Sequence, residues 1–237
     1  MRILITNDDG IQSPVLPLLA KWAQKHGEVT LVAPKYEQSG KSHSIDFRNE
    51  IEVKKVDFLD GVEAYSVDST PADCVRFAVN YLERKYDLCI SGVNRGYNLG
   101  ADMCYSGTIG GIMEAIRYDI KGIAVSTDVD ILLDSEKYFD DIYNYFVENK
   151  LFEYSDLYNV NIPHPEIKGF KITEQGGIYY SDNFVHKHDD MYLQEGEPVV
   201  IKENGLGVDI NATTEGYISV TPLARYKTNF VALEKLK

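Results

Sequence analysis

The sequence has few cysteines and no long apolar run, and both shortages restrict what the protein can be. Its 237 residues include three cysteines, Cys74, Cys89 and Cys104, none of them in C-x-x-C spacing. This pattern disfavours a disulfide framework and a zinc site, so we expect reduced thiols. No segment approaches the roughly 20 apolar residues of a membrane helix. The short apolar run 3–5 ends in polar residues, which disfavours a signal peptide and predicts a cytoplasmic protein without a membrane partner.

Positive charge is also scarce. The chain has 24 Lys and Arg against 37 Asp and Glu, a formal net charge of −13. Proteins that bind nucleic acid duplexes present a basic surface, so that partner is disfavoured. If the substrate is an anion, its site needs local positive charge, which a bound metal ion would supply. The hydrophobic content of 44% is ordinary for a globular domain and allows a sizeable core.

Apolar residues alternate between strand and helix patterns in the first part of the chain. Strands are predicted over 2–6, 29–33, 51–56, 65–67, 88–91 and 122–126, and helices over 14–26, 71–85, 108–118 and 135–150. This alternation predicts an α/β fold: a Rossmann-like three-layer core with a mostly parallel sheet covered on both faces.

After residue 150 the pattern changes to short strand-like segments separated by Gly and Pro. They cover 158–162, 168–173, 178–181, 199–202 and 216–221, and a short helix is predicted over 228–236. We therefore expect one domain of residues 1–237. It would consist of an α/β core, 1–150, and a β-rich C-terminal extension, 151–237, with a hairpin arm.

The first candidate site is Asn7-Asp8-Asp9-Gly10, directly after the first strand. In open α/β sheets, ligands bind beyond the carboxyl ends of the strands. Two adjacent carboxylates there are costly unless a cation lies between them. The simpler alternative is an Asx turn or a helix cap, which the same residue types favour.

The second candidate site is the polar segment 38–44, after the second strand. Ser39 offers a hydroxyl ligand, and Gly40 would permit close approach of the backbone. Lys41 and His43 could contact a phosphate. A flexible polar loop without function is the alternative.

The third candidate site is a long loop, 91–108, which contains four glycines. Loops of this length within compact domains are usually functional. Asn94 and Asn98 supply amide oxygens, while Arg95 could pair with a phosphate. Ser106-Gly107-Thr108 opens the next helix, whose free N–H groups suit an anion. A glycine-rich turn with Ser106 as an ordinary N-cap is the alternative.

All three segments follow strands of the predicted parallel sheet, so they should converge at one edge. Their candidate ligands Asp8, Asp9, Ser39 and Asn94 are oxygen donors. Such a set suits Mg²⁺, Mn²⁺ or Ca²⁺ better than zinc. The adjacent carboxylates differ from the D-x-D spacing of phosphatases that form an aspartyl-phosphate, so we expect a metal-activated water as nucleophile.

Several motifs occur in an order that resembles the SurE family, the stationary-phase survival protein nucleotidases. They are ILITNDDG, VAP followed by QSGKSHS, STPADCV, SGVNRGYNLGADMCYSGT, YNVNIP and GYISVTPL. The resemblance covers residue 2 to about 225. It implies hydrolysis of nucleoside 5′- and 3′-monophosphates with one divalent cation per subunit, Mg²⁺ or Mn²⁺, which Ca²⁺ could replace in crystals. It also implies a homodimer or homotetramer, built partly by exchange of C-terminal segments, which makes the extension 151–237 the oligomerisation segment.

The resemblance places the metal ligands at Asp8, Asp9, Ser39 and Asn94, with Asp8, Asp9 and Asn94 as catalytic residues. The expected phosphate and substrate contacts are Asn7, Gly40, Asn98, Ser106, Gly107 and Thr108. Two alternatives stay open: a broader phosphatase or exopolyphosphatase, and a nucleotide-binding regulatory module without catalysis. Base preference and the choice between 5′ and 3′ esters are not determined by these motifs.

Overall fold

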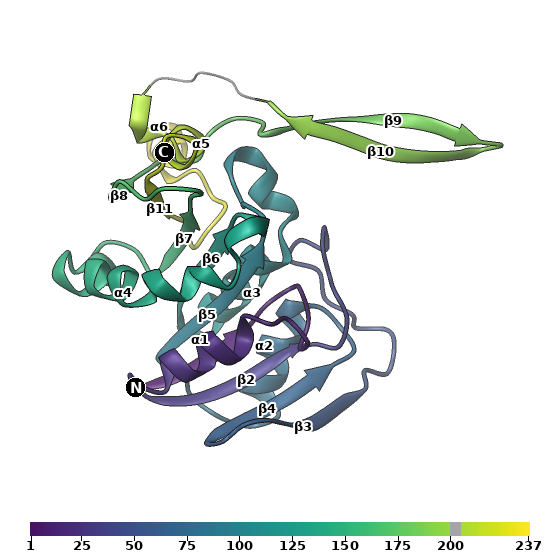
Figure 1. The fold of residues 1–237 in the computed structure, drawn as a ribbon, viewed down its shortest axis with the longest axis vertical. Coiled ribbons are helices and arrows are strands. Elements are labelled where there is room, and N and C mark those ends of the chain that lie inside the picture. The colour runs from purple at the N-terminus through teal and green to yellow at the C-terminus, as the bar shows by residue number, and fades with distance from the viewer. Residues whose placement is uncertain (200–204) are drawn as a thin grey trace.

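The computed structural model describes residues 1–199 and 205–237. Its centre is a nine-stranded sheet in the order β3-β4-β2-β1-β5-β6-β7-β11-β8 (Figure 1). The strands of this sheet are β1 (Arg2–Thr6), β2 (Glu28–Pro34), β3 (Val53–Leu59), β4 (Val62–Val67), β5 (Leu88–Arg95), β6 (Lys121–Thr127), β7 (Leu157–Ile162), β8 (Phe170–Ile172) and β11 (Ile218–Pro222). Only the β3–β4 and β7–β11 pairs of this sheet are antiparallel, which confirms the predicted α/β fold with a mostly parallel sheet.

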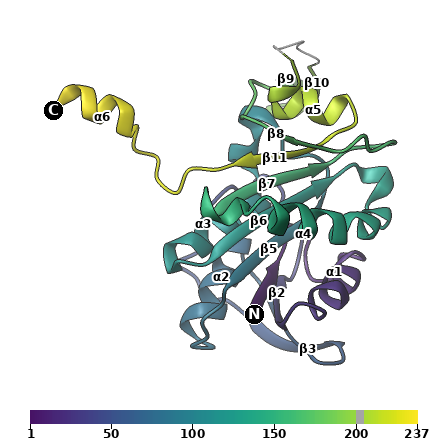
Figure 2. The same cartoon turned by 90° about the vertical axis from the view of Figure 1, so that its left-hand side faces the viewer.

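Helices cover both faces of the sheet, as predicted for a three-layer core. The α-helices are α1 (Leu16–Ala23), α2 (Pro71–Asn80), α3 (Gly107–Ala115), α4 (Phe139–Glu148), α5 (Asp209–Thr214) and α6 (Phe230–Leu236). Short 3₁₀ helices span Gly100–Tyr105, Ile116–Tyr118, Val129–Ile131, Asp134–Tyr138, Leu151–Glu153 and Gly205–Gly207. Helices α1 and α4 lie on one face, and α2 and α3 on the other (Figure 2).

The alternation of side chains along the strands builds a core on each face. On β1, Ile3 and Ile5 pack with residues of α1 and α4, while Leu4 packs with residues of α2. This period of two is what a strand buried on both sides requires. The N-terminus of α2 is as expected: the Thr70 hydroxyl accepts from the backbone N–H of Asp73, and Pro71 occupies the first turn.

Some boundaries differ from the predictions. Helix α2 ends at Asn80 instead of 85, because the chain turns there and Glu83 adopts a positive φ of 52°. The helix predicted over 135–150 begins with the 3₁₀ turn Asp134–Tyr138. Strand β5 continues to Arg95, so Asn94 and Arg95 belong to the strand end and not to the following loop. The strand predicted over 199–202 lies almost entirely outside the described residues.

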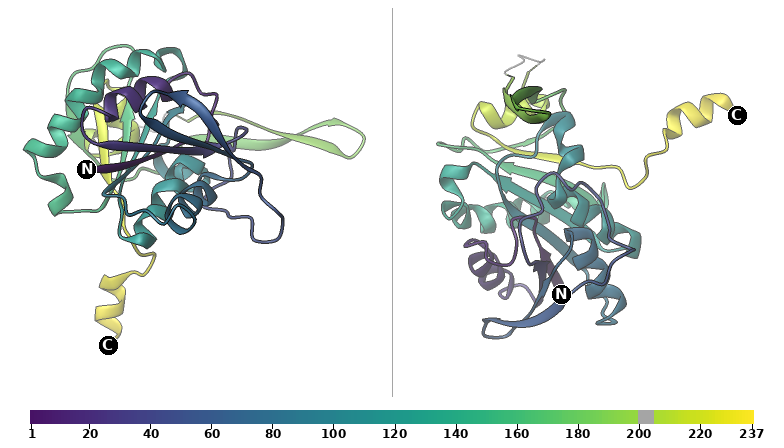
Figure 3. Two further views of the ribbon diagram at one scale, coloured as in Figure 1. Left: turned by 90° about the horizontal axis from the view of Figure 1, so that it is seen from below. Right: turned by 90° about the vertical axis from the view of Figure 1, so that its right-hand side faces the viewer.

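The chain after residue 150 contributes to two structures. Strands β7, β11 and β8 extend the main sheet beyond β6 without a break. Strands β9 (Tyr180–His188) and β10 (Met191–Pro198) form a separate antiparallel hairpin whose residues are exposed along both strands. The hairpin and α6 both stand away from the body of the molecule (Figure 3). The predicted β-rich C-terminal part with a hairpin arm is thus confirmed, although three of its strands belong to the main sheet.

Among the described residues, no helix combines the length and the apolar character needed to cross a membrane.

Candidate active site

The polar residues predicted for the site follow strands that are neighbours in the sheet. Strand β1 lies between β2 and β5 and is parallel to both, with Thr6 opposite Ser91. Hydrogen bonds donated by backbone N–H groups connect the loops beyond their carboxyl ends. The N–H of Gln38 donates to the carbonyl of Asp8 at 2.7 Å, and the N–H of Arg95 donates to Asp9 Oδ2 at 3.1 Å. The three segments therefore meet at one edge of the sheet.

Asp8 lies against the amino end of α3. The Thr108 hydroxyl donates to Asp8 Oδ1 at 2.5 Å, and the Thr108 N–H donates to Asp8 Oδ2 at 3.1 Å. Only 4% of Asp8 is exposed, and burial raises the pKa of its carboxyl even though these hydrogen bonds lower it. The partial positive charge of the helix end favours the carboxylate at this place.

Gly107 allows this close approach. A Cβ atom at Gly107 would lie 2.9 Å from the Cβ of Asp8 and 3.3 Å from the carbonyl oxygen of Gln38. The first distance is too short unless something shifts, and the second is tighter than most real contacts. The glycine is therefore required by the packing of α3 against the first two loops, a reason that the sequence alone did not reveal.

Asp9 is less buried than Asp8, and the pKa of its carboxyl is clearly raised. Burial and then the negative charge of Asp8 raise the pKa of Asp9 to about 6, with a smaller contribution from Glu37. The chain thus holds two acidic groups together at a cost. A bound cation would remove that cost, so the carboxylate pair fits a metal ion.

Two neutral oxygens near the pair remain without partners. The Asn7 amide donates to the carbonyl of Gly10 at 3.0 Å, but its buried Oδ1 has no hydrogen-bond partner. The Asn94 amide likewise donates to the carbonyl of Gly96 at 2.8 Å. Within the described chain, Asn94 Oδ1 accepts no hydrogen bond. A buried acceptor without a partner is uncommon, and Asn7 Oδ1 is suited to a cation or to a donor on a ligand. Asn94 is half-buried, so its oxygen is accessible to a cation as well as to water.

Ser39 and Gly40 lie in the segment that contacts Asp8. The Ser39 hydroxyl donates to Glu37 Oε1 at 2.6 Å, which leaves its lone pairs free to accept. Gly40 has a φ of 70°, and a Cβ there would meet nothing within 4 Å. The positive φ is a reason for glycine at this turn, and the expectation that Gly40 permits close approach of the backbone to a ligand stays a prediction.

Asn98 fixes the long loop to β6 and β7 through hydrogen bonds. Its backbone N–H donates to Asn161 Oδ1 at 2.9 Å and its side-chain amide donates to Ser126 Oγ at 2.8 Å. Its carbonyl accepts from the amides of Asn159 and Asn161. Asn98 is 8% exposed, and both partners on β7 are fully buried. Asn159 and Asn161 stand out in the sequence only as polar residues inside an otherwise apolar strand.

His43 contacts Glu114 on α3. Its Nε2 lies 2.7 Å from Glu114 Oε2 on α3, and Glu114 also accepts from Arg76 at 3.2 Å and from Arg117 at 2.9 Å. His43 thus has a protein partner at Nε2, and the expectation that it contacts a phosphate stays a prediction. Its ring joins the loop after β2 to α3, while the Ser42 N–H donates to the carbonyl of Tyr105 at 2.9 Å.

Ser106 begins α3 as its N-cap. The Ser106 hydroxyl accepts from the backbone N–H of Ile109 at 3.2 Å. Within residues 1–199 and 205–237, no group of three or more His, Cys, Asp or Glu side chains could hold a metal ion. A cation at this edge would therefore need neutral oxygens in addition to the two carboxylates.

Comparison with known proteins places the chain in a family. The sequence profile described as Survival protein SurE matches residues 3–182. The chain belongs to the SurE family. A protein of Pseudothermotoga lettingae named 5′-nucleotidase SurE is 39% identical over 249 residues, covering 100% of this chain and 94% of that protein. A protein of the same name from Clostridium beijerinckii is 36% identical and covers 98% and 96% of the two chains.

A solved structure agrees with the sequence comparisons. The crystal structure of the SurE protein of Aquifex aeolicus matches with a TM-score of 0.83 at 34% identity, covering 100% of this chain and 98% of the other. The family resemblance drawn from the motifs is confirmed by these matches. The strand order of the sheet explains why motifs separated by up to 100 residues meet around Asp8.

Proposed function

We propose that the protein is a metal-dependent nucleotidase that hydrolyses nucleoside 5′- and 3′-monophosphates to nucleoside and inorganic phosphate. The observation that carries the proposal is the pair of carboxylates Asp8 and Asp9 at the end of β1, packed against the amino end of α3. The relatives described above are named 5′-nucleotidase SurE, which supports this reaction and substrate class.

Four side chains would hold the cation, one Mg²⁺ or Mn²⁺ per subunit. They are Asp8, Asp9, Ser39 and Asn94, all oxygen donors of the kind these ions prefer. The raised pKa of Asp9, to about 6, supports the proposal because it marks a carboxylate pair that lacks a compensating charge. When bound, the cation would neutralise charge on the phosphate and activate a water molecule.

The remaining predicted residues would hold the substrate phosphate beside this pair. Ser106, Gly107 and Thr108 form the first turn of α3, whose dipole favours an anion at that end. Asn7 offers its unpartnered oxygen to a donor group of the substrate. Gly40 would act by allowing the positive φ of its turn, and Asn98 would act by stabilising the long loop.

Asp9 is better placed than Asp8 to accept a proton from the attacking water. Both oxygens of Asp8 accept hydrogen bonds from Thr108. Asp9 accepts one, from the backbone N–H of Arg95, and is less buried. A carboxylate with free acceptor capacity can take a proton without breaking a bond that positions it.

We also propose that the chain works in the cytoplasm as a homodimer or homotetramer. The hairpin and α6 support an assembly, since they expose large apolar side chains such as Phe184 (73%), Phe230 (53%) and Leu236 (84%). Cross-linking with mass measurement in solution distinguishes the two assemblies from a monomer. Three free cysteines, two of them buried, are in keeping with a reducing compartment.

The test is phosphate release from AMP and GMP by protein stripped of metal with a chelator and then supplied with Mn²⁺ or Mg²⁺. We expect activity only with metal, and a loss of at least about 100-fold in Asp8→Asn and Asp9→Asn. Asp57→Asn, an exposed carboxylate on β3, is the matched control. Calorimetric titration with Mn²⁺ should show binding to the control and none to the two site variants. Metal-independent activity of Asp8→Asn would overturn the proposal.

A panel of substrates separates the alternatives. Equal rates on nucleotides, sugar phosphates and polyphosphate would identify a broader phosphatase. Tight nucleotide binding without phosphate release, in protein that binds Mn²⁺, would identify a regulatory module.

A further inference from the structure

A cavity lies between the two helices that cover one face of the sheet. Helix α1 connects β1 to β2, and α4 connects β6 to β7, so the two helices leave a gap over β5 and the start of β6. The gap contains a cavity of about 340 Å³. Its floor includes Leu88 and Ile123 near the amino ends of their strands. The cavity is therefore at the edge of the sheet opposite to Asp8 and Asp9.

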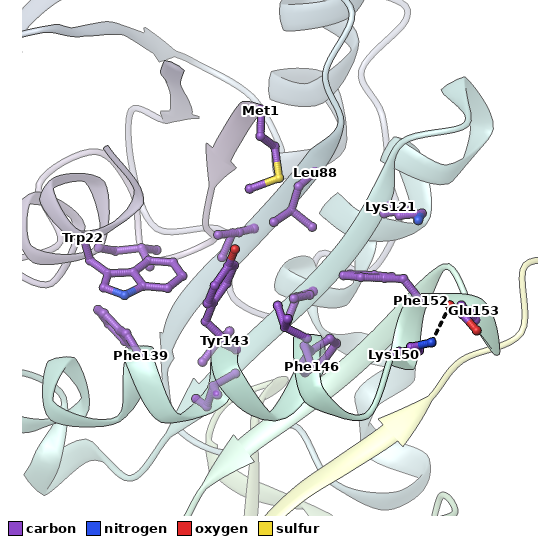
Figure 4. Close-up of a pocket in the computed structure, with 16 residues that line it drawn as sticks. Met1, Trp22, Leu88, Lys121, Phe139, Tyr143, Phe146, Lys150, Phe152 and Glu153 are labelled. Atoms are coloured by element: carbon purple, nitrogen blue, oxygen red, sulfur yellow. Dashed lines mark ion pairs between the residues drawn. The ribbon is translucent and has the colours of Figure 1, made fainter. Parts of the chain in front are cut away.

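The cavity wall is apolar and rich in aromatic rings. Figure 4 shows Trp22 and Phe139 at one end, Tyr143 and Phe146 along α4, and Phe152 at the other end. The floor can be reached by solvent: Leu88 and Ile123 are 7% and 8% exposed, whereas Ile5, on the same face of the neighbouring strand β1, is 0% exposed. Apolar cavities hold water poorly and bind apolar ligands instead.

Positive charge lies at one end of this cavity, in a chain whose net charge is −13. Lys121 begins β6, and its ammonium lies 5.1 Å from the centre of the Phe152 ring. It forms no ion pair with any described residue. Lys150 lies at the same end, with its Nζ 3.9 Å from Glu153 Oε1, and both side chains of that pair are about 70% exposed. Lys121 is thus the cation available to a ligand.

We infer that this cavity binds a medium-chain amphipathic carboxylate, with its apolar chain among the aromatic rings and its head group at Lys121. An apolar cavity of about 150 Å³ admits benzene, so a cavity of this size has room for an apolar body of about ten to fourteen carbon atoms. A straight chain suits the elongated row of rings from Trp22 to Phe152. The inference is independent of the proposed nucleotidase activity.

The single tryptophan provides the measurement, since Trp22 lines the cavity and the chain has one Trp. Decanoate should change Trp22 emission saturably, below its micelle concentration. In Lys121→Gln the dissociation constant should rise about two- to fivefold, as expected for one exposed charge pair. Lys171→Gln is the matched control, because its ammonium lies 4.9 Å from the Tyr217 ring in a region outside the cavity. Decanol should bind both variants equally.

Ile142→Phe, which adds volume to the wall, should weaken decanoate and decanol at least tenfold while circular dichroism stays native. The inference is overturned by emission that does not respond to decanoate. It is also overturned if Lys121→Gln and Lys171→Gln weaken binding equally, or if Ile142→Phe does not weaken it. Binding of decanoate only at dilutions that dissociate an oligomer would show that a second copy of the chain covers the cavity, and would likewise overturn it.

Discussion

Replacing Glu114 by glutamine should lower the stability of the protein more than any replacement of a surface carboxylate. The Glu114 side chain is 1% exposed and contacts two cations, Arg76 at 3.2 Å and Arg117 at 2.9 Å, and the imidazole of His43 at 2.7 Å. These partners come from three separate segments of the chain. Glu114→Gln keeps the size of the side chain but removes the charge that all three share.

The size of the expected stability loss depends on the burial of Glu114 and on the partial exposure of its three partners. Breaking a fully buried ion pair costs about 3–5 kcal/mol, and a hydrogen bond to a charged group contributes about 1.5–3 kcal/mol. The partners here are 32–57% exposed, so water compensates part of the loss. We expect a loss of about 2–3 kcal/mol in the free energy of unfolding at pH 7. For a chain of this length that corresponds to a drop in Tm of about 4–12 °C.

The effect should depend on pH in a known direction. Burial works to raise the pKa of Glu114, but hydrogen bonds from His43 and Arg117 outweigh it, and the pKa is lowered. A carboxyl with a lowered pKa in the folded state stabilises the fold above its unfolded pKa, about 4.5. That contribution disappears as the pH falls through the folded value. The difference between wild type and Glu114→Gln should therefore shrink below about pH 4.5.

Thermal unfolding followed by circular dichroism at pH 7 and pH 4 is the assay. Glu28→Gln is the matched control, because Glu28 pairs with Arg2 at 3.4 Å and both side chains are more than half exposed. Its cost should stay below about 1 kcal/mol. A Tm for Glu114→Gln within 2 °C of the Glu28→Gln value, or a deficit of unchanged size at pH 4, would refute this account of the cluster.

Three further replacements test the site and its supports. Gly107→Ala places a methyl group 2.9 Å from the Cβ of Asp8, so phosphate release should fall at least tenfold, while Gly207→Ala, which has open space, should keep full activity. Asp209→Asn disrupts a carboxylate that accepts three backbone N–H groups, and unfolding by urea should show a loss of about 1–3 kcal/mol. Asp9→Asn removes a charge beside Asp8, so metal-free protein should gain about 1 kcal/mol in stability. Added Mn²⁺ should raise the Tm of the wild type but not that of Asp9→Asn.

The sequence allowed us to predict that the three candidate segments converge, because each follows the end of a strand in a parallel sheet. Asp8 and Asp9 follow an apolar run that can only be a strand, and Asn94 lies near the end of another. Once the sheet is parallel, these ends share an edge. Periodicity and turn chemistry are sufficient for that conclusion, and the family motifs add the identity of the expected ligands.

The contacts that stabilise the candidate site could not be predicted from periodicity and turn chemistry. Asn98 is braced by Ser126 and Asn161, which lie 28 and 63 residues away and reach it only because β6 and β7 follow β5 in the sheet. The same holds for His43, whose partner Glu114 is 71 residues away. A polar residue within a loop looks similar in sequence whether it faces a ligand or another loop. Sheet order and helix packing decide between the two.

The arrangement around Asp8 and Asp9 lowers the stability of the fold and at the same time suits the pair to bind a cation. A pair of neighbouring acids with raised pKa values lowers the stability of the metal-free fold, and the surrounding contacts keep the pair in place. Thr108 fixes Asp8 with two hydrogen bonds, and Gly107 allows α3 to approach. The free energy lost in this way is available for binding, since a cation that compensates the charges stabilises the folded chain by mass action. A replacement that stabilises the metal-free protein at this place should therefore weaken the site, which is the opposite of the expected behaviour of the Glu114 cluster.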